Sequence, residues 1–318
     1  PGRGRRRALL VGVNYSGSYA QLKGCINDVW NIHCLLRRAL AFREEQIRVL
    51  VDGEGGLPAP DGREPTRAGI LAGLRWLTDG AQPGDELFLL FCGFGAQLPQ
   101  GPGSEVHEAC LVPCDFAADL PAGFLPPRLD GAPLPPPNSA SYRLLPLSHV
   151  QEIISCLPAG SRMTVLLDCA YPVVPSVSMA QNLPPTFRRV VRRPVDHGKH
   201  HDFFSRPRFL ELPPLPVRHG LQHSPQLTFP QCVLHCFCAC RLQEWDAELP
   251  LEGTIQGAFT WAFVRALAAG GFRCRIRQLR EALDRTTAEL KRSLRGVGQT
   301  PVLLLSGAAS EDDVVLGA

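Results

Sequence analysis

The chain has 318 residues, 45% of them hydrophobic and 20% charged, which is enough apolar side chain for a large core and excludes global disorder. Its 33 Lys and Arg nearly balance its 30 Asp and Glu, so a strongly basic nucleic-acid-binding protein is not expected. The 30 Gly follow no three-residue period, which excludes collagen. No apolar run reaches the roughly 18–20 residues that a membrane span needs.

Short apolar runs bounded by turn residues predict buried strands along the whole chain. The predicted strands are 7–15, 47–51, 87–92, 109–113, 163–170, 232–242 and 302–307.

Apolar residues at helical spacing predict five helices between these strands. The second of them is the most sharply bounded, because Pro65 and Thr66 favour its start and Gly80 its end. The predicted helices are 22–41, 65–80, 147–157, 256–270 and 276–294.

Strands that alternate with amphipathic helices indicate a largely parallel sheet covered by helices on both faces. Ligand chemistry in such sheets gathers at the carboxyl ends of the strands. In this chain those ends are expected at Gly12–Tyr15, Cys92–Gln97, Asp168–Tyr171 and Cys240–Trp245.

Three segments depart from this alternation. Residues 1–6 form a basic tail, and residues 117–146 hold eight Pro and predict a surface loop. Residues 183–230 hold nine Pro and eight Lys and Arg against three acids, which predicts a long insertion. The regions 7–182 and 231–318 then form one domain on either side of this insertion.

Twelve cysteines are spread over the chain, most of them inside apolar runs where a thiol behaves as a small hydrophobic group. We therefore expect free thiols and a reducing compartment, the cytoplasm. Cys232, Cys236, Cys238 and Cys240 with His235 also raise a zinc hypothesis, but alternate positions on one strand lack the paired spacing of zinc sites. A strand lined by buried cysteines is the preferred interpretation.

Two further clusters have more ordinary interpretations. Cys92 and Cys169 are expected at neighbouring strand ends. Two core thiols are the preferred interpretation of them, and a redox pair is the alternative. His197, His200 and His201 are expected to form a solvated part of the insertion rather than a metal site.

Seven segments follow one another along the chain: ALLVGVNYSGSYAQLKGCINDV, FREEQIRVLVDG, PTRAGILAGLRWL, PGDELFLLFCGFGAQ, EACLVPCDF, LPAGSRMTVLLDCAYP and QGAFTWAF. In this order they resemble metacaspases, the caspase-like cysteine peptidases of non-animal lineages. This resemblance covers most of 7–182 and 232–308. It implies a caspase-like three-layer α-β-α sandwich with a central, largely parallel sheet, in which 7–182 is the large-subunit region and 231–318 the small-subunit region of the same domain.

The chemistry of such peptidases needs a His that takes up a proton and a Cys that attacks the peptide carbonyl as thiolate. The segment CGFGA is similar to the family's Ser-Gly-His-Gly-Gly and puts Phe94 at the His position. The segment LLDCAYP is similar to Asp-Ser-Cys-His-Ser-Gly and puts Ala170 at the Cys position. Neither side chain can do the required chemistry, so the resemblance implies a degenerate member of the family.

Cys169 stands one residue before the nucleophile position. A one-residue slip along a strand turns a side chain to the opposite face, so this thiol is expected to point away from the cleft unless a local bulge redirects it. It would also need a base, for which His107 and His149 are the candidates.

Asp168 matches an acidic residue that in the family helps to line a pocket for Arg or Lys, which is sound chemistry for a carboxylate. A strand-end Asp that caps backbone N–H groups is the alternative. The family's calcium site falls on Pro146 and Leu147, whose side chains cannot coordinate a hard cation, and only Asp115 remains. We therefore expect no cofactor.

Three functional hypotheses follow, and none of them requires nucleic acid. The first is an inactive metacaspase-like regulator, decoy or scaffold that binds basic peptides or an active metacaspase. The second is an Arg/Lys-specific cysteine endopeptidase that uses Cys169. The third is an interaction module that acts through 183–230.

Overall fold

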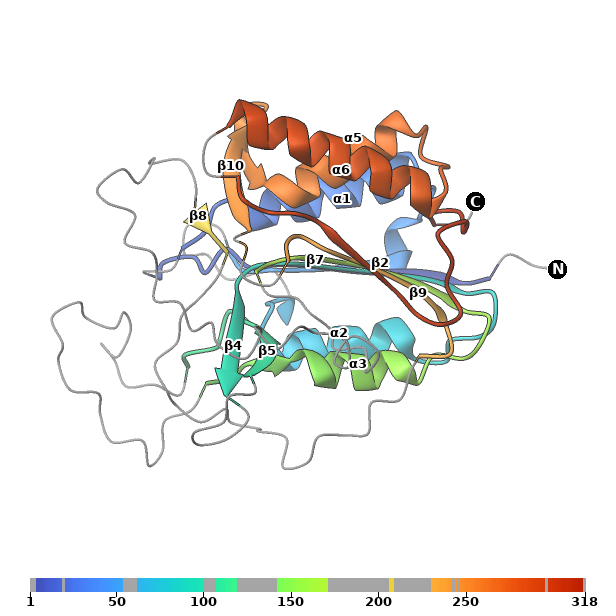
Figure 1. The fold of residues 1–318 in the computed structure, drawn as a ribbon. Helices are drawn as coiled ribbons and strands as arrows, with labels where there is room; N and C mark the ends of the chain where they lie inside the picture. The colour runs from blue at the N-terminus through green and yellow to red at the C-terminus, as the bar shows by residue number, and fades with distance from the viewer. Residues whose placement is uncertain are drawn as a thin grey trace, which may run out of the picture.

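A computed structural model describes residues 4–18, 21–53, 62–99, 107–118, 142–170, 206–208, 230–241, 244, 246–294 and 297–316. Most of the predicted loop 117–146 and of the predicted insertion 183–230 therefore lies outside the described residues. The termini of the described chain lie at the same end of the molecule (Figure 1).

A six-stranded sheet forms the centre of the fold, in the order β12-β9-β7-β3-β1-β2. All neighbouring strands run parallel except β12, which is antiparallel to β9. The strands are β1 (Arg6–Gly12), β2 (Ile47–Val51), β3 (Glu86–Cys92), β7 (Arg162–Asp168), β9 (Val233–Cys238) and β12 (Val302–Leu305).

Helices cover both faces of this sheet, which gives three layers (Figure 1). One face carries α1 (Cys25–Arg38), α5 (Ala258–Ala269) and α6 (Ile276–Ser293), and the other carries α2 (Arg67–Thr78) and α3 (Leu147–Ser155). A short 3-10 helix, η1 (Glu44–Gln46), leads into β2. Burial on both faces explains why every residue of β3, ELFLLFC, is buried.

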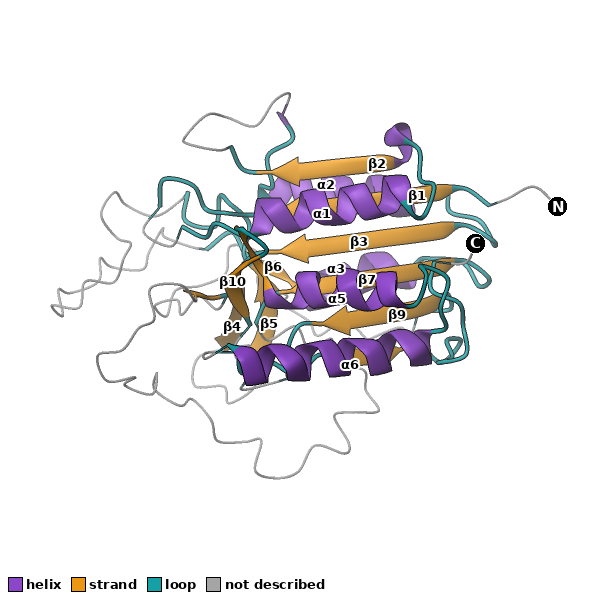
Figure 2. Ribbon diagram, turned by 90° about the horizontal axis from the view of Figure 1, so that it is seen from above, coloured by secondary structure: helices purple, strands orange, loops and turns teal. Residues whose placement is uncertain are grey.

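Two small antiparallel sheets lie at one end of the central sheet, beside the arrowheads of its parallel strands (Figure 2). One has the order β4-β5-β6 and the other β11-β10-β8. Their strands are β4 (Gly95–Pro99), β5 (His107–Leu111), β6 (Leu145–Pro146), β8 (Arg206–Pro207), β10 (Ala247–Leu251) and β11 (Thr254–Gly257). These sheets surround the strand ends at which the sequence predicts ligand chemistry.

Each strand and helix expected from the sequence is present, with shifts at the ends. β1 begins at Arg6, one residue before the predicted boundary of the basic tail, because Arg6 pairs with Glu86 of β3. α5 begins only at Ala258, since the residues before it form β11. The small sheets, apart from β5, were not predicted.

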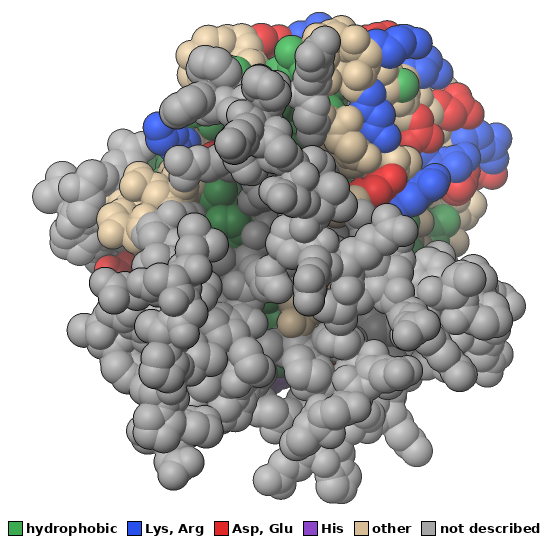
Figure 3. All heavy atoms as spheres, turned by 60° about the vertical axis from the view of Figure 1, so that its left-hand side comes forward, with side chains coloured by type: hydrophobic (Ala, Val, Ile, Leu, Met, Phe, Trp, Pro, Cys, Tyr) green, Lys and Arg blue, Asp and Glu red, His purple; other side chains and the backbone are tan. Residues whose placement is uncertain are grey.

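Figure 3 shows the side chains on one face of the molecule. In the described part of the face in Figure 3, basic and acidic side chains alternate and form no patch of a single sign. None of the described helices combines the length and the apolar character that crossing a membrane requires.

Candidate functional site

The carboxyl ends of three parallel strands stand side by side, as the sequence predicts. Gly12 pairs with Cys92, and Cys92 pairs with Asp168. The Asp168 side chain is fully buried and accepts a hydrogen bond from Thr260 N at 3.1 Å and one from the Thr260 hydroxyl. The first turn of α5 thus fixes one oxygen of this carboxylate.

A second buried carboxylate, Asp28, comes from α1. Its oxygens accept hydrogen bonds from Gly257 N at 2.9 and 3.0 Å. Asp28 was not predicted as a site residue, although it ends the segment LKGCIND that carries part of the metacaspase resemblance. That segment was the available signal.

A guanidinium joins the two carboxylates. Arg208 Nη2 donates to Asp28 Oδ2 at 2.6 Å, and Arg208 Nη1 lies 2.9 Å from Asp168 Oδ1. Arg208 Nη2 also lies 4.0 Å from a carboxylate oxygen of Glu248. The Arg208 side chain has no exposed surface, so the contacts form without solvent screening. We call Asp28, Asp168, Asp246 and Glu248 the acidic pocket.

Burial sets the protonation of this pocket. It raises the pKa of Asp28 to about 7, against the opposing effect of Arg208. Burial, and then the neighbouring Asp168, raise the pKa of Asp246 well above its ordinary value, and neither Asp246 oxygen accepts a hydrogen bond from a described residue. Burial therefore favours the neutral form of Asp246. Burial lowers the pKa of Arg208, but Asp168 and its other neighbours raise it by more, so the guanidinium keeps its charge.

The backbone of Arg208 is held as firmly as its side chain. β8 pairs antiparallel with β10, and Arg208 N donates to Asp246 O at 2.8 Å. Arg208 O accepts two backbone hydrogen bonds, from Gly95 N at 3.1 Å and from Ala170 N at 3.2 Å. Two N–H groups that converge on one carbonyl oxygen form the arrangement that stabilises an oxyanion in acyl transfer.

Ala170 itself donates one of these hydrogen bonds, and Phe94 directly precedes Gly95, which donates the other. A Cβ added to Gly95, the residue after Phe94, would stand 1.8 Å from Ala170 O, so the two strand ends are in direct backbone contact. Phe94 is 5% exposed, and its ring packs against the ring of Tyr15 with 4.7 Å between centroids. Phe94 N donates to the Tyr15 hydroxyl at 2.8 Å. The predicted His position is thus occupied by part of an aromatic cluster.

Cys169 is 1% exposed. Burial raises the pKa of its thiol well above the ordinary value, and Asp246, Cys240 and Asp168 raise it further. No imidazole is among the described groups that act on its ionisation. The thiol is therefore protonated at neutral pH, which is unfavourable for a nucleophile.

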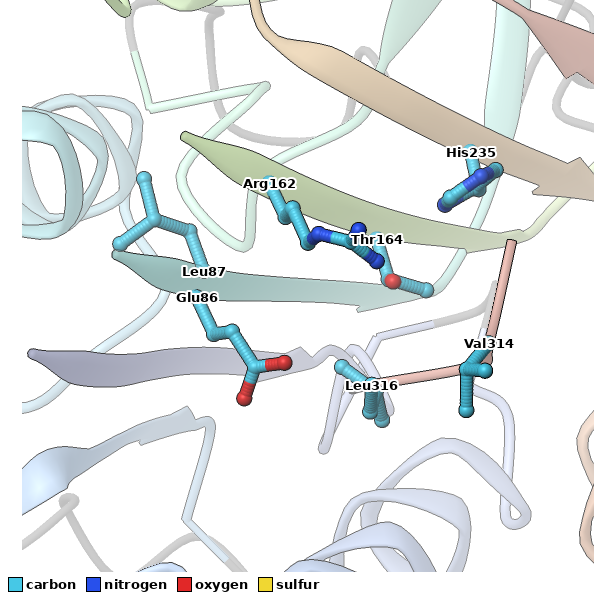
Figure 4. A pocket seen from close by; sticks show the side chains of 7 residues that line it. All are labelled: Glu86, Leu87, Arg162, Thr164, His235, Val314 and Leu316. Carbon is cyan, nitrogen blue, oxygen red and sulfur yellow. The ribbon is translucent and has the colours of Figure 1, made fainter. Parts of the chain in front are cut away.

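The structure gives no description of an imidazole in contact with Cys169. His149 lies on α3, and the His107 side chain is outside the described residues. His235 pairs with Thr164, four residues before Asp168 and therefore roughly 13 Å from the strand end. It faces a small pocket with Arg162 and Thr164 (Figure 4) and lies 3.0 Å from Asp313.

Metal sites have limited support among the described residues. Ligand atoms of Asp28, Cys92 and Asp168 lie within 4.8 Å of one another, but the Arg208 guanidinium already bridges the two carboxylates. Burial also raises the pKa of the Cys92 thiol well above the ordinary value, which disfavours a thiolate ligand.

The residues at the expected calcium position do not fit a calcium site. Asp115 accepts a hydrogen bond from Arg67 N at 2.7 Å and pairs with Arg143 at 3.2 Å. Its carboxylate therefore serves the start of α2. Pro146 and Leu147 begin α3 without a carboxylate to offer.

The cysteine-lined strand is as predicted. Cys236 and Cys238 are buried, with 3.8 Å between their sulfur atoms, and none of the twelve cysteines, all of them in described parts of the chain, forms a disulfide. The His235 side chain contacts Asp313 and not these thiols.

The Cys92 sulfur, one member of the redox-pair hypothesis, lies 3.8 Å from Thr260 Oγ1. The cluster His197, His200 and His201 lies outside the described residues.

Comparison with known proteins identifies relatives for part of the chain. Residues 6–121 match the family model "Metacaspase, peptidase C14 domain". Metacaspase-1 of Eremothecium gossypii is 44% identical over 115 residues, covering 36% of this chain and 25% of its own length. Metacaspase-1 of Coccidioides immitis is 37% identical over 170 residues, covering 53% of this chain and 31% of its own length. The chain thus spans a third or less of the length of these relatives.

Solved structures share the architecture. Protein GSU0716 from Geobacter sulfurreducens superposes with a TM-score of 0.57 at 16% identity, covering 96% of this chain and 94% of that chain. Caspase-1 from Spodoptera frugiperda superposes with a TM-score of 0.49 at 11% identity, covering 99% and 90%. The three-layer α-β-α sandwich with a central, largely parallel sheet is confirmed, as expected from the sequence. Over residues 6–121 the sequence is thus similar to the metacaspase peptidase C14 domain.

Proposed function

We propose that this protein is a catalytically inactive metacaspase-like protein that acts by binding, as a regulator, decoy or scaffold. Its ligands would be basic peptides or an active metacaspase. One observation carries the proposal. Ala170 and the neighbour of Phe94, Gly95, bind a carbonyl through their N–H groups, and Phe94 and Ala170 stand where the resemblance requires a base and a nucleophile.

The chemistry of these two side chains supports inactivity. A phenyl ring cannot accept a proton, and a methyl group cannot attack a carbonyl. Loss of members of a catalytic unit costs several orders of magnitude in rate in other proteases. The Phe94 ring is also packed against the Tyr15 ring. Neither water nor another base can therefore take the place of the Phe94 ring.

A binding role is supported by the acidic pocket and the neighbouring N–H groups of Gly95 and Ala170, which together we call the cleft. The acidic pocket has the chemistry for a guanidinium, since carboxylates bind it through charge-assisted hydrogen bonds. The paired N–H groups of Gly95 and Ala170 hold a peptide carbonyl. A cleft with both elements can hold a basic peptide without cutting it.

Twelve cysteines without a disulfide support a reducing compartment, and we propose the cytoplasm. The described part of the face in Figure 3 shows no basic patch that would support a nucleic-acid partner.

The test is hydrolysis of an Arg-ended fluorogenic peptide by the purified chain, with and without calcium, beside Cys169→Ala. We expect no turnover in either protein. Turnover abolished by Cys169→Ala would refute the proposal and establish the alternative of a peptidase with a displaced nucleophile. A labelled thiol-reactive peptide ending in Arg gives an independent check, because covalent capture at Cys169 would support the same alternative.

A further inference from the structure

The segment Arg206–Arg208 is bound to the rest of the chain as an added strand. Arg206 pairs with Glu248, and Pro207 pairs with Ala247, both in antiparallel register. Arg208 N continues the pairing to Asp246 O at 2.8 Å. Addition of an extended segment to a strand is a common mode of peptide recognition, in which the backbone supplies affinity and side-chain pockets supply specificity.

The carbonyl of Arg208 takes the position that a reacting carbonyl would need. Gly95 N and Ala170 N both donate to it, at 3.1 and 3.2 Å. In a peptidase, donors placed this way stabilise the charge that develops on the oxygen during attack. Here the residue nearest to that carbonyl on the β7 side is Ala170, which has no atom that can attack it.

The side chain of Arg208 fills the acidic pocket completely. Its guanidinium contacts Asp28 and Asp168 and has no exposed surface. Four acids surround this one cation, more than a simple structural ion pair requires. Carboxylates bind a guanidinium through charge-assisted hydrogen bonds, so a pocket lined by these acids favours a cationic side chain.

We propose that Arg206–Arg208 is an internal peptide ligand, held in the cleft as a substrate would be held before cleavage and retained because the cleft cannot cut it. An extended peptide with an arginine at the same place, supplied by another protein, competes with it for the cleft. This proposal rests on the proposed function, because an active cleft would cut such a ligand rather than hold it.

The experiment compares the full-length chain with Arg208→Ala. The probe is a fluorescently labelled acetyl-Arg-Pro-Arg-amide peptide, which copies residues 206–208. The matched probe carries citrulline in place of the last arginine, so it keeps the shape and loses the charge. Arg265→Ala is the control variant, since Arg265 lies on α5 with 55% of its side chain exposed and pairs with Glu252.

Anisotropy measures the binding of each probe. If Arg208 leaves the pocket about 1% of the time, removal of its side chain should tighten binding of the arginine peptide about 100-fold, and we expect at least about tenfold. The citrulline peptide should bind Arg208→Ala weakly, and Arg265→Ala should behave as the unaltered chain. Addition of Asp168→Asn to Arg208→Ala should abolish the gain.

Two results would overturn the proposal. One is a folded Arg208→Ala protein that binds the arginine and citrulline peptides equally. The other is a chain with Arg208 intact that binds the arginine peptide as tightly as the variant does. If Arg208→Ala unfolds readily, its melting temperature should rise with the arginine peptide and not with the citrulline peptide, and no selective rise would refute the proposal.

Hydrolysis separates this proposal from the proposed function. The same peptide with a coumarin amide at its end reports cleavage. Cleavage would refute inactivity, whereas absence of selective binding without cleavage would refute only the internal ligand.

Discussion

Replacement of Arg208 by Met should destabilise the fold strongly, because it keeps an apolar stem of similar length and removes the cation from the acidic pocket. Asp28 and Asp168 would then be buried without their partner. Removal of one member of a buried ion pair costs about 3–5 kcal/mol. That is a large part of the roughly 5–15 kcal/mol by which a domain is stable.

The cost should grow with pH, and Asp28 sets the direction. Burial raises its pKa to about 7 while Arg208 lowers it, so loss of Arg208 raises it further. When the pKa of a carboxyl is higher in the folded than in the unfolded state, stability falls as the pH rises from the unfolded-state pKa to the folded-state pKa. In the unaltered protein this loss stops near pH 7, whereas in Arg208→Met it continues. If the pKa of Asp28 rises by one further unit, the loss of folding free energy at about pH 8 increases by about 1.4 kcal/mol.

Urea unfolding near pH 5 and near pH 8 measures both effects. We expect a loss of about 3–5 kcal/mol near pH 8 and a smaller loss near pH 5. Arg265→Met is the control, because an exposed pair contributes only about 0–1 kcal/mol. A loss below about 1 kcal/mol, or equal losses at the two pH values, would show that the pocket does not depend on this cation.

Three further perturbations test the packing of the cleft. Phe94→Ala should cost about 3–5 kcal/mol in denaturant unfolding, since its ring is buried against a tyrosine ring; a loss under about 1 kcal/mol would mean that the ring is not packed. Gly257→Ala should cost about 1–3 kcal/mol or more in the same assay, because its Cβ would stand 2.3 Å from a pocket carboxylate oxygen; an unchanged unfolding midpoint would contradict the close approach. Brief iodoacetamide treatment of the folded protein should alkylate the exposed Cys34 and Cys156 and spare buried Cys169, as read by mass spectrometry; early modification of Cys169 would favour the peptidase alternative.

The central sheet could be predicted because its strands are buried on both faces. A run such as LFLLFC is apolar throughout and short, which distinguishes it from a helix once its flanking turns are considered. The β10–β11 hairpin was missed although a signal was present. Glu252 and Gly253 form its two-residue turn, with φ of 50° and 85°, as a type I′ turn requires. Pro250 inside β10 argued against a strand.

The candidate site was predicted only in part. Asp168, Phe94 and Ala170 could be placed because each follows a strong strand pattern. Arg208 could not, because it stands among other basic residues and prolines that predict a solvated insertion. Its partner Asp28 is 180 residues away along the chain. No local pattern encodes a contact of that range, and only the closed fold brings the two charges together.

The most direct measurement is hydrolysis of an Arg-ended fluorogenic peptide by Arg208→Ala. In the unaltered chain, Arg208 occupies the pocket and competes with an added peptide, so turnover is hardest to detect there. In Arg208→Ala the pocket is open. We predict that this variant binds the peptide and releases no fluorophore. Turnover by Arg208→Ala that disappears on addition of Cys169→Ala would contradict catalytic inactivity.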